Sequence, residues 1–571
     1  MPLQWTFQHS TNGPEPKDLP AWAGSLNISH FLARLLWRRG VCSLPEMDRY
    51  LSPGLRHLPS LESWPALIQG AEVLAECIHR GQRVGIWGDY DVDGITATAL
   101  LVDFFRSKGV PVSFALPDRF EDGYGLSVNG VERLAEQGAG VLLTVDCGIA
   151  DLPAVKRARE LGMRVVISDH HLPGPDLPPA DAIVDPVVDE TCSYFGVAGV
   201  GVAFLLMAAL NRILPGERVD VRTSLDLVAL GTIADVVPLT GVNRILVKNG
   251  LLVLGQGKRP GIFALKEVSK LPPTAPMGSG QVGFGLAPRI NAAGRLASPQ
   301  EALDLLLAPD LSTARPLAAR LEKYNQMRRS TEKDILEQAL EQAEGHTDRL
   351  GLVLCGENWH QGVIGIVASR VVEHMHRPAL LLTGHADGLK GSGRSIPDFD
   401  LHQGLCGCAH LLKRFGGHRQ AAGLTLGPDK LEDLRAAFDQ AVREQLGEGL
   451  PSPSLQVEAK LGLDMVDLGL VQEIDLLQPF GLGNPQPVFC SPLLRVQKYK
   501  VFGSKHVSLQ LRDEQAGVTM LGKAWRQADV LSEKVTGQNM QLAFTPRMNY
   551  YNGLTSIDLQ IRDWQCLSGE S

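Results

Sequence analysis

The segment Arg83-Val-Gly-Ile-Trp-Gly-Asp-Tyr-Asp-Val-Asp-Gly94 indicates both the class of fold and the kind of chemistry. It opens with a short apolar run, passes through a loop that carries Asp89, Asp91 and Asp93, and leads into a helical pattern over Ile95–Ser107. A strand that runs through a polar loop into a helix is typical of a parallel α/β unit. Alternating aspartates on an extended loop place their carboxylates on one side, which suits hard divalent cations.

An EF-hand calcium loop begins in the same way, with aspartates at positions 1, 3 and 5 and glycine at position 6. Such a loop needs a bidentate glutamate at its twelfth position. Counted from Asp89, that position falls on Leu100, which has no ligand atom. The stretch therefore predicts a metal site of another kind.

The alternation of apolar runs and helical patterns continues after this stretch and predicts a parallel sheet with helices on both faces. The predicted strands are Val84–Trp87, Val112–Ala115, Val141–Val145 and Val165–Ser168. The helical patterns are Val131–Gln137, Leu152–Leu161, Val200–Leu214 and Leu225–Leu230.

Three further acidic or histidine-bearing segments follow this pattern. Asp146 ends one strand, Asp169-His170-His171 ends the next, and Asp235 closes an apolar helix. A single aspartate after a strand is usually a helix cap or a turn residue. The joint occurrence favours metal binding instead, because the carboxyl ends of parallel strands meet in one crevice.

The composition limits the classes of function. With 571 residues the chain is expected to form two to four domains. Its 55 basic and 63 acidic residues give a net charge of −8, which argues against nonspecific coating of nucleic acid and requires any DNA-binding cations to be concentrated in a groove. The nine cysteines are interpreted as reduced thiols, and the lack of a signal or membrane-spanning stretch predicts a cytoplasmic location.

The expected architecture is α/β, with two α/β lobes around a cleft, joined by a long helix and followed by a small OB-like β-barrel. The second lobe is predicted to contain a helix over Val363–Val372 and another over Leu401–Phe415, and the barrel to contain strands at Leu493–Val501, His506–Leu511, Val518–Leu521, Met540–Pro546 and Thr555–Ile561. The predicted boundaries are 1–70 for an N-terminal helical segment, 71–298, 299–345 for the connecting helices, 346–450 and 451–571.

A glycine-rich segment in the second lobe, Lys390-Gly-Ser-Gly-Arg-Ser395, is predicted to be a turn whose N–H groups, hydroxyls and guanidinium cradle a phosphate. Such turns are common, so this signal is weak on its own. His360 and His418 add polar groups that face the same cleft, with helix capping as an equal alternative for both.

The four metal-site segments resemble motifs I to IV of the DHH phosphoesterase superfamily, and Gly416-Gly-His418 resembles the motif of its DHHA1 domain. The form Asp-Tyr-Asp-x-Asp-Gly at Asp89, the segment Pro288-Arg-Ile-Asn-Ala-Ala-Gly-Arg295 and the third domain are similar to the RecJ family of exonucleases. The resemblance spans about residue 20 to the end.

The resemblance implies two Mn²⁺ or Mg²⁺ ions, with Asp146 as the bridge between them. Asp93, His170 and Asp235 would hold one ion, and Asp91 with Asp89 the other. His171 would face the scissile phosphate, so the implied catalytic residues are His171 and Asp146.

The same resemblance implies a pocket for a 5′-terminal phosphate at Ser392, Gly393 and Arg394, which Arg119 closes from the first lobe. Aromatic residues make up only 6% of the chain, so base stacking would rest on few side chains such as Tyr124. The remaining residues implied in DNA or phosphate binding are Arg289, Asn291, Arg295, His360 and His418.

The implied activity is hydrolysis of single-stranded DNA in the 5′→3′ direction to mononucleotides, in DNA recombination and repair. Single-strand-binding protein and a RecQ-type helicase are implied as partners, and no association with a membrane is expected. Two alternatives stay open: a DHH oligoribonuclease or cyclic-dinucleotide phosphodiesterase, and a non-catalytic replication scaffold.

Overall fold

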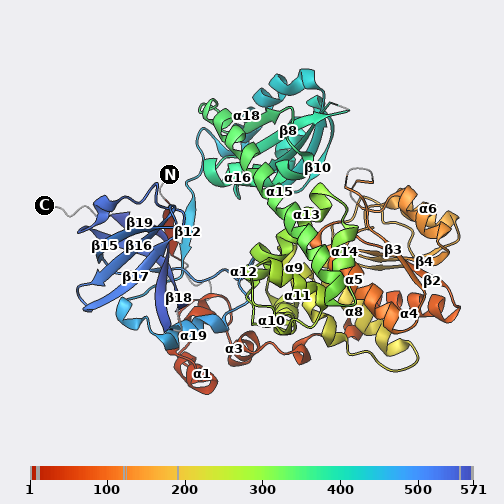
Figure 1. Ribbon diagram of the computed structural model, residues 1–571, viewed down its shortest axis with the longest axis horizontal. Coiled ribbons are helices and arrows are strands. Elements are labelled where there is room, and N and C mark those ends of the chain that lie inside the picture. Colours follow the sequence, from red (N-terminus) through yellow and green to blue (C-terminus); the bar gives the residue numbers. More distant parts are fainter. Residues whose placement is uncertain are drawn as a thin grey trace.

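The computed structural model describes residues 3–7, 13–119, 122–123, 125–189, 192–386, 388–551 and 554–566. The ribbon contains two α/β lobes, a group of helices between them and a β-barrel, all arranged around a central opening (Figure 1). The predicted α/β class with a C-terminal barrel is confirmed. Within the described part of the chain, no helix combines the length and apolarity that a membrane crossing requires.

The first lobe is built on a five-stranded parallel sheet in the order β3-β2-β4-β5-β6. Its strands are β2 (Arg83–Trp87), β3 (Val112–Ala115), β4 (Ala139–Val145), β5 (Arg164–Ser168) and β6 (Ala182–Val184). Its covering helices are α4 (Pro65–His79), α5 (Val92–Ser107) and α8 (Gly199–Ile213) on one face, and α6 (Val128–Glu136) and α7 (Leu152–Glu160) on the other. The three-residue strand β6 was not predicted.

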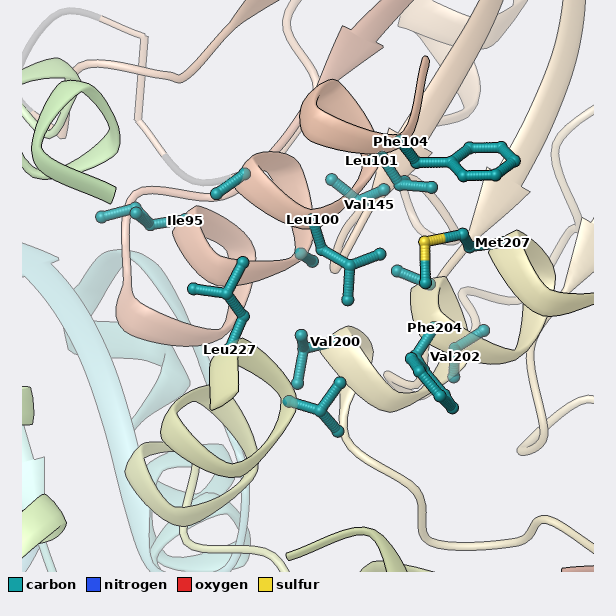
Figure 2. Packing of buried hydrophobic residues seen from close by; sticks show 14 of the residues in the cluster. Ile95, Leu100, Leu101, Phe104, Val145, Val200, Val202, Phe204, Met207 and Leu227 are labelled. Carbon is teal, nitrogen blue, oxygen red and sulfur yellow. The ribbon is translucent and has the colours of Figure 1, made fainter. Parts of the chain in front are cut away.

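The α5–α8 contact forms the centre of the largest core cluster. Leu100 of α5 and Val200 of α8 belong to this cluster, and Phe104 of α5 lies near Met207 of α8 (Figure 2). All four side chains are almost wholly buried. This packing holds the N-termini of both helices at the carboxyl edge of the sheet, where the acidic residues lie.

A helical region extends the first lobe, and one long helix leads out of it to the second lobe. The region contains α9 (Leu225–Ala234), α10 (Gly241–Gln256), α11 (Pro260–Val268), α12 (Ser279–Gln281), the π-helical turn η4 (Val282–Leu286), α13 (Ala287–Leu296) and α14 (Gln300–Leu306). The 34-residue helix α15 (Leu311–Glu344) packs on α11 and α13 in the first lobe and on α16 in the second.

The second lobe contains a mixed sheet in the order β10-β11-β9-β8-β7. Its strands are β7 (Leu352–Gly356), β8 (Ala379–His385), β9 (Gly388–Arg394), β10 (Leu412–Gly417) and β11 (Ala421–Leu426), and its helices are α16 (Gln361–Met375), α17 (Leu401–Gly407) and α18 (Leu431–Leu446). The predicted helix over Leu401–Phe415 is wrong in its second half: α17 ends at Gly407, and β10 begins at Leu412 because that segment pairs with β11.

The predicted glycine-rich turn at Lys390–Ser395 is also wrong, because most of this segment belongs to β9, an interior strand of the sheet. Its backbone pairs with β8 on one side and β11 on the other, so its N–H groups are not available as a phosphate cradle. A Cβ atom at Gly391 would lie 2.4 Å from Leu382, and one at Gly393 would lie 2.6 Å from Leu380. These glycines therefore serve close packing inside the lobe.

The C-terminal domain is a barrel in which β19 pairs with both β17 and β18. Its strands are β13 (Ala459–Lys460), β14 (Phe489–Cys490), β15 (Leu494–Phe502), β16 (His506–Asp513), β17 (Val518–Ala524), β18 (Asn539–Tyr551) and β19 (Leu554–Cys566), with helix α19 (Leu468–Leu476) between β13 and β14. All five predicted strands lie within or next to these elements.

The N-terminal segment packs against the barrel. Strand β1 (Gln4–Phe7) pairs with β12 (Ser454–Val457). Helices α1 (Leu19–Leu26), α2 (His30–Arg38) and α3 (Leu44–Leu51) form a core with Leu477, and Arg39 makes a buried ion pair with Glu458. Helix α4, in contrast, packs on the first-lobe sheet.

Candidate metal centre and phosphate pocket

The acidic residues gather where β2, β4 and β5 end, at the carboxyl edge of the parallel sheet. One group consists of Asp93, His170 and Asp235, and a second consists of Asp89, Asp91 and Asp146. In each group, one possible ligand atom per residue lies within 4.8 Å of the others. His170 Nε2 also lies 3.1 Å from Asp146 Oδ1, so the two groups adjoin.

The loop after β2 shows how its three aspartates are positioned. They were expected on an extended loop, but Asp91 is the N-cap of α5 and Asp93 lies in the first turn of this helix. Asp91 accepts hydrogen bonds from the backbone N–H groups of Asp93 and Gly94, at 2.9 and 3.1 Å. The carboxylates are therefore brought together by the start of the helix and not by the alternation of side chains along an extended loop.

Backbone N–H groups at the start of α8 hold the Asp93 carboxylate. Gly199 N donates to Asp93 at 2.7 Å, and Val200 N donates to it at 3.0 Å. The positive end of the helix dipole favours a carboxylate in this position. A Cβ atom at Gly199 would lie 2.4 Å from Asp146 Oδ1, so glycine is required for the close approach of this helix to the cluster.

Asp146 adopts a left-handed backbone conformation, with φ = 62°. This conformation is uncommon outside glycine and, where tertiary contacts impose it, often marks a functional site. Asp146 N donates to Ser168 O at 2.9 Å, which ties the end of β4 to the end of β5. The carboxylate is 1% exposed and lies between the two groups.

The donor set fits divalent cations. Asp89 Oδ1, Asp146 Oδ1, Asp235 Oδ2 and His170 Nε2 are buried and have no partner with hydrogen-bond geometry among the described residues, although His170 Nε2 and Asp146 Oδ1 lie only 3.1 Å apart. Burial, together with the charge of Asp93, raises the pKa of Asp146 well above its usual range, and burial with the charge of Asp91 raises the pKa of Asp235 to about 7. Cations between these oxygens would supply the missing partners and remove the carboxylate repulsion.

The two adjacent histidines have opposite protonation behaviour. Burial and the charge of His171 lower the pKa of His170 to about 4, so His170 is neutral at pH 7, as a metal ligand must be. Burial also lowers the pKa of His171, but its 2.7 Å hydrogen bond from Nδ1 to Asp169 and the charge of Asp169 outweigh this effect and raise the pKa to about 9. His171 therefore carries a positive charge beside the cluster.

Asp169 is a functional residue that the sequence analysis did not select. Its carboxylate accepts from Ile149 N at 3.0 Å and His170 N at 2.8 Å in addition to its contact with His171. It thereby sets both the shape of the loop and the charge of His171. The sequence signal that could have selected Asp169 was its position at the end of a strand. Many aspartates that only cap helices occupy the same position, so the signal was not specific.

A cavity of about 370 Å³ opens from the metal cluster toward the second lobe. The wall opposite the carboxylates is polar and basic, and it comes from four separate parts of the chain. The cavity is lined by Asp89, Tyr90, Asp91, Arg119, Ala234, Asp235, Asn291, Arg295, Gln361, Gly362, Gly365, Ser392 and Arg394.

Arg119 is held at this cavity from two sides. Its guanidinium lies 4.1 Å from the centre of the Tyr90 ring, and its Nε donates to Gly294 O at 3.1 Å. A Cβ atom at Gly294 would lie 2.7 Å from Tyr90 O, so α13 must carry glycine here to come this close. Tyr90 and Gly294 were not predicted as site residues.

Arg295 and Arg394 complete the basic wall beside the N-terminus of α16. Arg295 Nη1 donates to Gly362 O at 2.9 Å, and burial, reinforced by the charge of Arg119, lowers its pKa to about 9. Arg394 Nη1 donates to Ser392 Oγ at 3.2 Å, and burial lowers its pKa. Clustered, desolvated guanidinium groups next to a helix N-terminus form a site for an anion.

The structure does not bring every predicted binding residue to the cavity. Arg289 forms an ion pair with Glu322 at 2.6 Å and joins α13 to α15. His360 is the N-cap of α16, His418 is exposed at the end of β10, and Gly393 faces packed leucines. Tyr124 lies outside the described residues.

Three family profiles match separate parts of the chain. The DHH family, N-terminal domain, matches residues 83–232, the DHHA1 domain matches residues 348–444, and the RecJ OB domain matches residues 457–563. The chain is 38% identical to the single-stranded-DNA-specific exonuclease RecJ of Dickeya dadantii, over 96% of each chain. It is 36% identical to that of Escherichia coli, over 96% of this chain and 97% of the relative.

Solved structures give the same result for the fold. The crystal structure of RecJ in complex with Mn²⁺ from Thermus thermophilus matches 99% of this chain and 80% of its own, with a TM-score of 0.84 and 30% identity. The Mg²⁺ complex of the same protein matches with a TM-score of 0.79 and 29% identity, over 99% of this chain and 78% of its own. The chain belongs to the RecJ family of single-stranded-DNA-specific exonucleases.

Proposed function

We propose that the chain is a metal-dependent exonuclease that degrades single-stranded DNA in the 5′→3′ direction to mononucleotides. The observation that carries this proposal is the single cavity in which buried carboxylates face a basic wall. Membership of the RecJ family supports the activity, and relatives solved with Mn²⁺ and Mg²⁺ support the cofactor.

The two groups of ligands would hold two cations, Mn²⁺ or Mg²⁺. Asp93, His170 and Asp235 would hold one, Asp89 and Asp91 the other, and Asp146 would touch both. When bound, the ions supply an activated water and neutralise charge on the phosphate oxygens.

The chain's own groups orient the substrate. His171, held in its charged form by Asp169, would donate to the scissile phosphate, and the short 2.7 Å contact keeps its ring in one orientation.

The basic wall accounts for the proposed direction. Arg119, Ser392 and Arg394 would receive the terminal 5′ phosphate, so the next phosphodiester along the strand would lie at the carboxylates. Asn291 and Arg295 line the same cavity and would contact a phosphate of the strand as the strand moves through the cavity. A cavity of about 370 Å³ between two lobes has room for one strand and not for a duplex.

The alternatives from the sequence are not favoured. A scaffold without catalysis has no need for unpartnered buried carboxylates around a cluster of ligand atoms. A short oligoribonuclease has no need for the barrel that matches the RecJ OB domain. We also propose a cytoplasmic role in recombination and repair, in which single-strand-binding protein and a RecQ-type helicase would supply the single strand.

The test uses purified protein with 5′- and 3′-labelled single strands and with duplex, in Mn²⁺ or Mg²⁺. We expect release of 5′-labelled mononucleotides from single strands, none from blunt duplex, and complete loss with EDTA. Activity that persists in EDTA, or that begins at the 3′ end, would contradict the proposal.

A further inference from the structure

A second cavity lies on the sheet of the second lobe, on the part of one face that α16 leaves uncovered. It has a volume of about 430 Å³, and its walls include Lys390, Arg414, Gly416, Gly423 and Thr425. Helix α16 packs on β8 and β9, and no comparable contact exists with β10 or β11 among the described residues. We call this cavity the β10 groove.

The strand register places the β10 groove next to the phosphate pocket. Ser392 of β9 pairs with Gly423 of β11, which pairs with Gly416 of β10. Two residues further along, Lys390 pairs with Thr425, which pairs with Arg414. Residues two apart on a strand share a face and lie about 7 Å apart, so Lys390 and Ser392 point the same way.

The packing of the intervening residues shows which face this is. Leu424 is buried, and Cβ atoms at Gly391 and Gly393 would meet core leucines, so these positions face the interior. Ser392 and Lys390 therefore face outward. The β10 groove is a continuation of the surface that holds Ser392 in the catalytic cavity.

The charge of the β10 groove points to an anionic ligand. Lys390 and Arg414 are exposed, and neither forms an ion pair within the described part of the chain. Among the described residues that line the wall there is no Asp or Glu, although the chain as a whole has a net charge of −8. Cations that lack acidic neighbours in an acidic protein favour a phosphate-bearing ligand.

The floor of the β10 groove allows a ligand to approach the backbone closely. Added Cβ atoms at Gly416 and Gly423 would find, respectively, no atom within 4 Å and one atom at 4.0 Å. Both glycines are exposed, so the backbone surface is open to a flat group such as a sugar or a base. A nucleotide unit combines such a group with the phosphate that the cations favour.

We propose that the β10 groove binds one nucleotide on the 5′ side of the phosphate held by Ser392 and Arg394. The proposal rests on the proposed function of that pocket. A strand can then move one nucleotide further, so that an internucleotide phosphate occupies the pocket and the first nucleotide lies in the β10 groove. Water adds to phosphorus at the second linkage, the P–O3′ bond breaks, the leaving O3′ takes a proton, and a dinucleotide with a shortened 5′-phosphorylated strand results.

The test uses a strand whose first linkage is a methylenephosphonate in place of O3′, which keeps its negative charge and has no P–O3′ bond to break. We expect the wild-type protein to release a dinucleotide from it. Lys390→Ala with Arg414→Ala should lower this release about tenfold and change mononucleotide release from ordinary strands by less than about twofold, because two phosphate contacts are lost only upstream. Lys430→Ala, which removes an exposed cation outside the groove, is the matched control and should change neither rate.

The outcomes separate this inference from the proposed function. Degradation of ordinary strands without any dinucleotide from the modified strand would overturn the β10 groove proposal alone. No degradation of either strand would overturn both.

Equal losses on both strands in the double variant would mean that the cations serve ordinary catalysis, which contradicts the upstream assignment. The same contradiction follows if the double variant weakens only the binding of free deoxynucleoside monophosphate, measured by calorimetry, and leaves dinucleotide release unchanged. In that case the groove is a product site.

Discussion

The two walls of the catalytic cavity are built in opposite ways. The acidic wall comes from segments that follow neighbouring parallel strands of one sheet and from Asp235 at the end of α9, and Asp89, Asp93 and Asp146 are each no more than 2% exposed. The basic wall is assembled from a first-lobe loop, α13, the start of α16 and the interior strand β9. The acidic wall is formed within the first lobe, whereas the basic wall depends on how the two lobes meet.

The difference has an energetic consequence. Burial raises the pKa of the carboxylates and lowers the pKa of Arg295 and Arg394, so each wall is destabilised by its own charges. Cations compensate the acidic wall, and phosphate compensates the basic wall. The cavity is thus complementary to a metal-bound phosphodiester, and the walls can be tested separately.

The largest effect is expected from the acidic wall. Asp146→Ala removes the carboxylate that belongs to one group and lies beside His170 of the other, so turnover should fall by at least about a thousandfold, while binding of single-stranded DNA should change little. Initial rates with Mn²⁺ and binding by fluorescence anisotropy measure the two effects. Near-normal turnover would show that the two groups do not act through a shared ligand.

A smaller loss is expected when the carboxylates are kept and the charge of His171 is changed. Asp169→Asn removes the charge that raises the pKa of His171 to about 9, so His171 should titrate near or below neutral pH. Turnover should fall about a hundredfold at pH 8 and recover partly at pH 6, as for other general-acid or electrostatic groups. A loss that is the same at both pH values would indicate that Asp169 only maintains the loop, whose backbone it also holds.

The basic wall should affect substrate choice more than chemistry. In the register that releases the first nucleotide unit, Arg394→Ala removes a charge-assisted contact to the terminal phosphate, so kcat/KM for this release should fall about tenfold on 5′-phosphorylated strands and much less on 5′-hydroxyl strands. Arg289→Ala is the control, because this guanidinium pairs with Glu322 away from the cavity. Equal losses on both substrates would show that Arg394 contacts an internal phosphate.

The smallest effect concerns stability without metal. The folded-state pKa of Asp235 is raised to about 7, above the value of roughly 3.9 in an unfolded chain. A group with a raised folded pKa contributes stability that is complete below the unfolded pKa and is lost as pH rises through the folded one. The Tm of EDTA-treated protein should therefore fall by a few degrees between pH 5 and pH 8.

Added Mn²⁺ should reverse this trend, because cations bind the deprotonated carboxylates. The increase in Tm on adding Mn²⁺ should be larger at pH 8 than at pH 5, as measured by calorimetry. The Asp146→Ala variant provides the control and should show a smaller increase at pH 8. A Tm of the metal-free protein that rises over this range would contradict the assignment of a repelling, buried cluster.

Local sequence patterns were enough to predict the parallel sheet and the strand-end members of the acidic wall. Asp89, Asp146 and Asp169 each directly follow the end of a predicted strand or lie within two residues of it, and a parallel sheet brings the ends of its strands together. Spacing along the chain was therefore enough to predict which carboxylates meet. It could not show that Asp91 caps α5, because that depends on which backbone N–H groups face the side chain.

The resemblance implied Arg119, Asn291, Arg295, Ser392 and Arg394 as binding residues, and all five line the cavity, but the way the basic wall is built became visible only in the folded protein. Lys390–Ser395 has the composition of a turn, yet pairing with β8 and β11 and packing against leucines make most of it an interior strand. The stacking of Arg119 on Tyr90 and the packing of the N-terminal helices on the barrel join residues far apart in the chain. Local patterns record the backbone preferences of neighbouring residues, whereas these contacts depend on how separate elements pack, which no short stretch of sequence specifies.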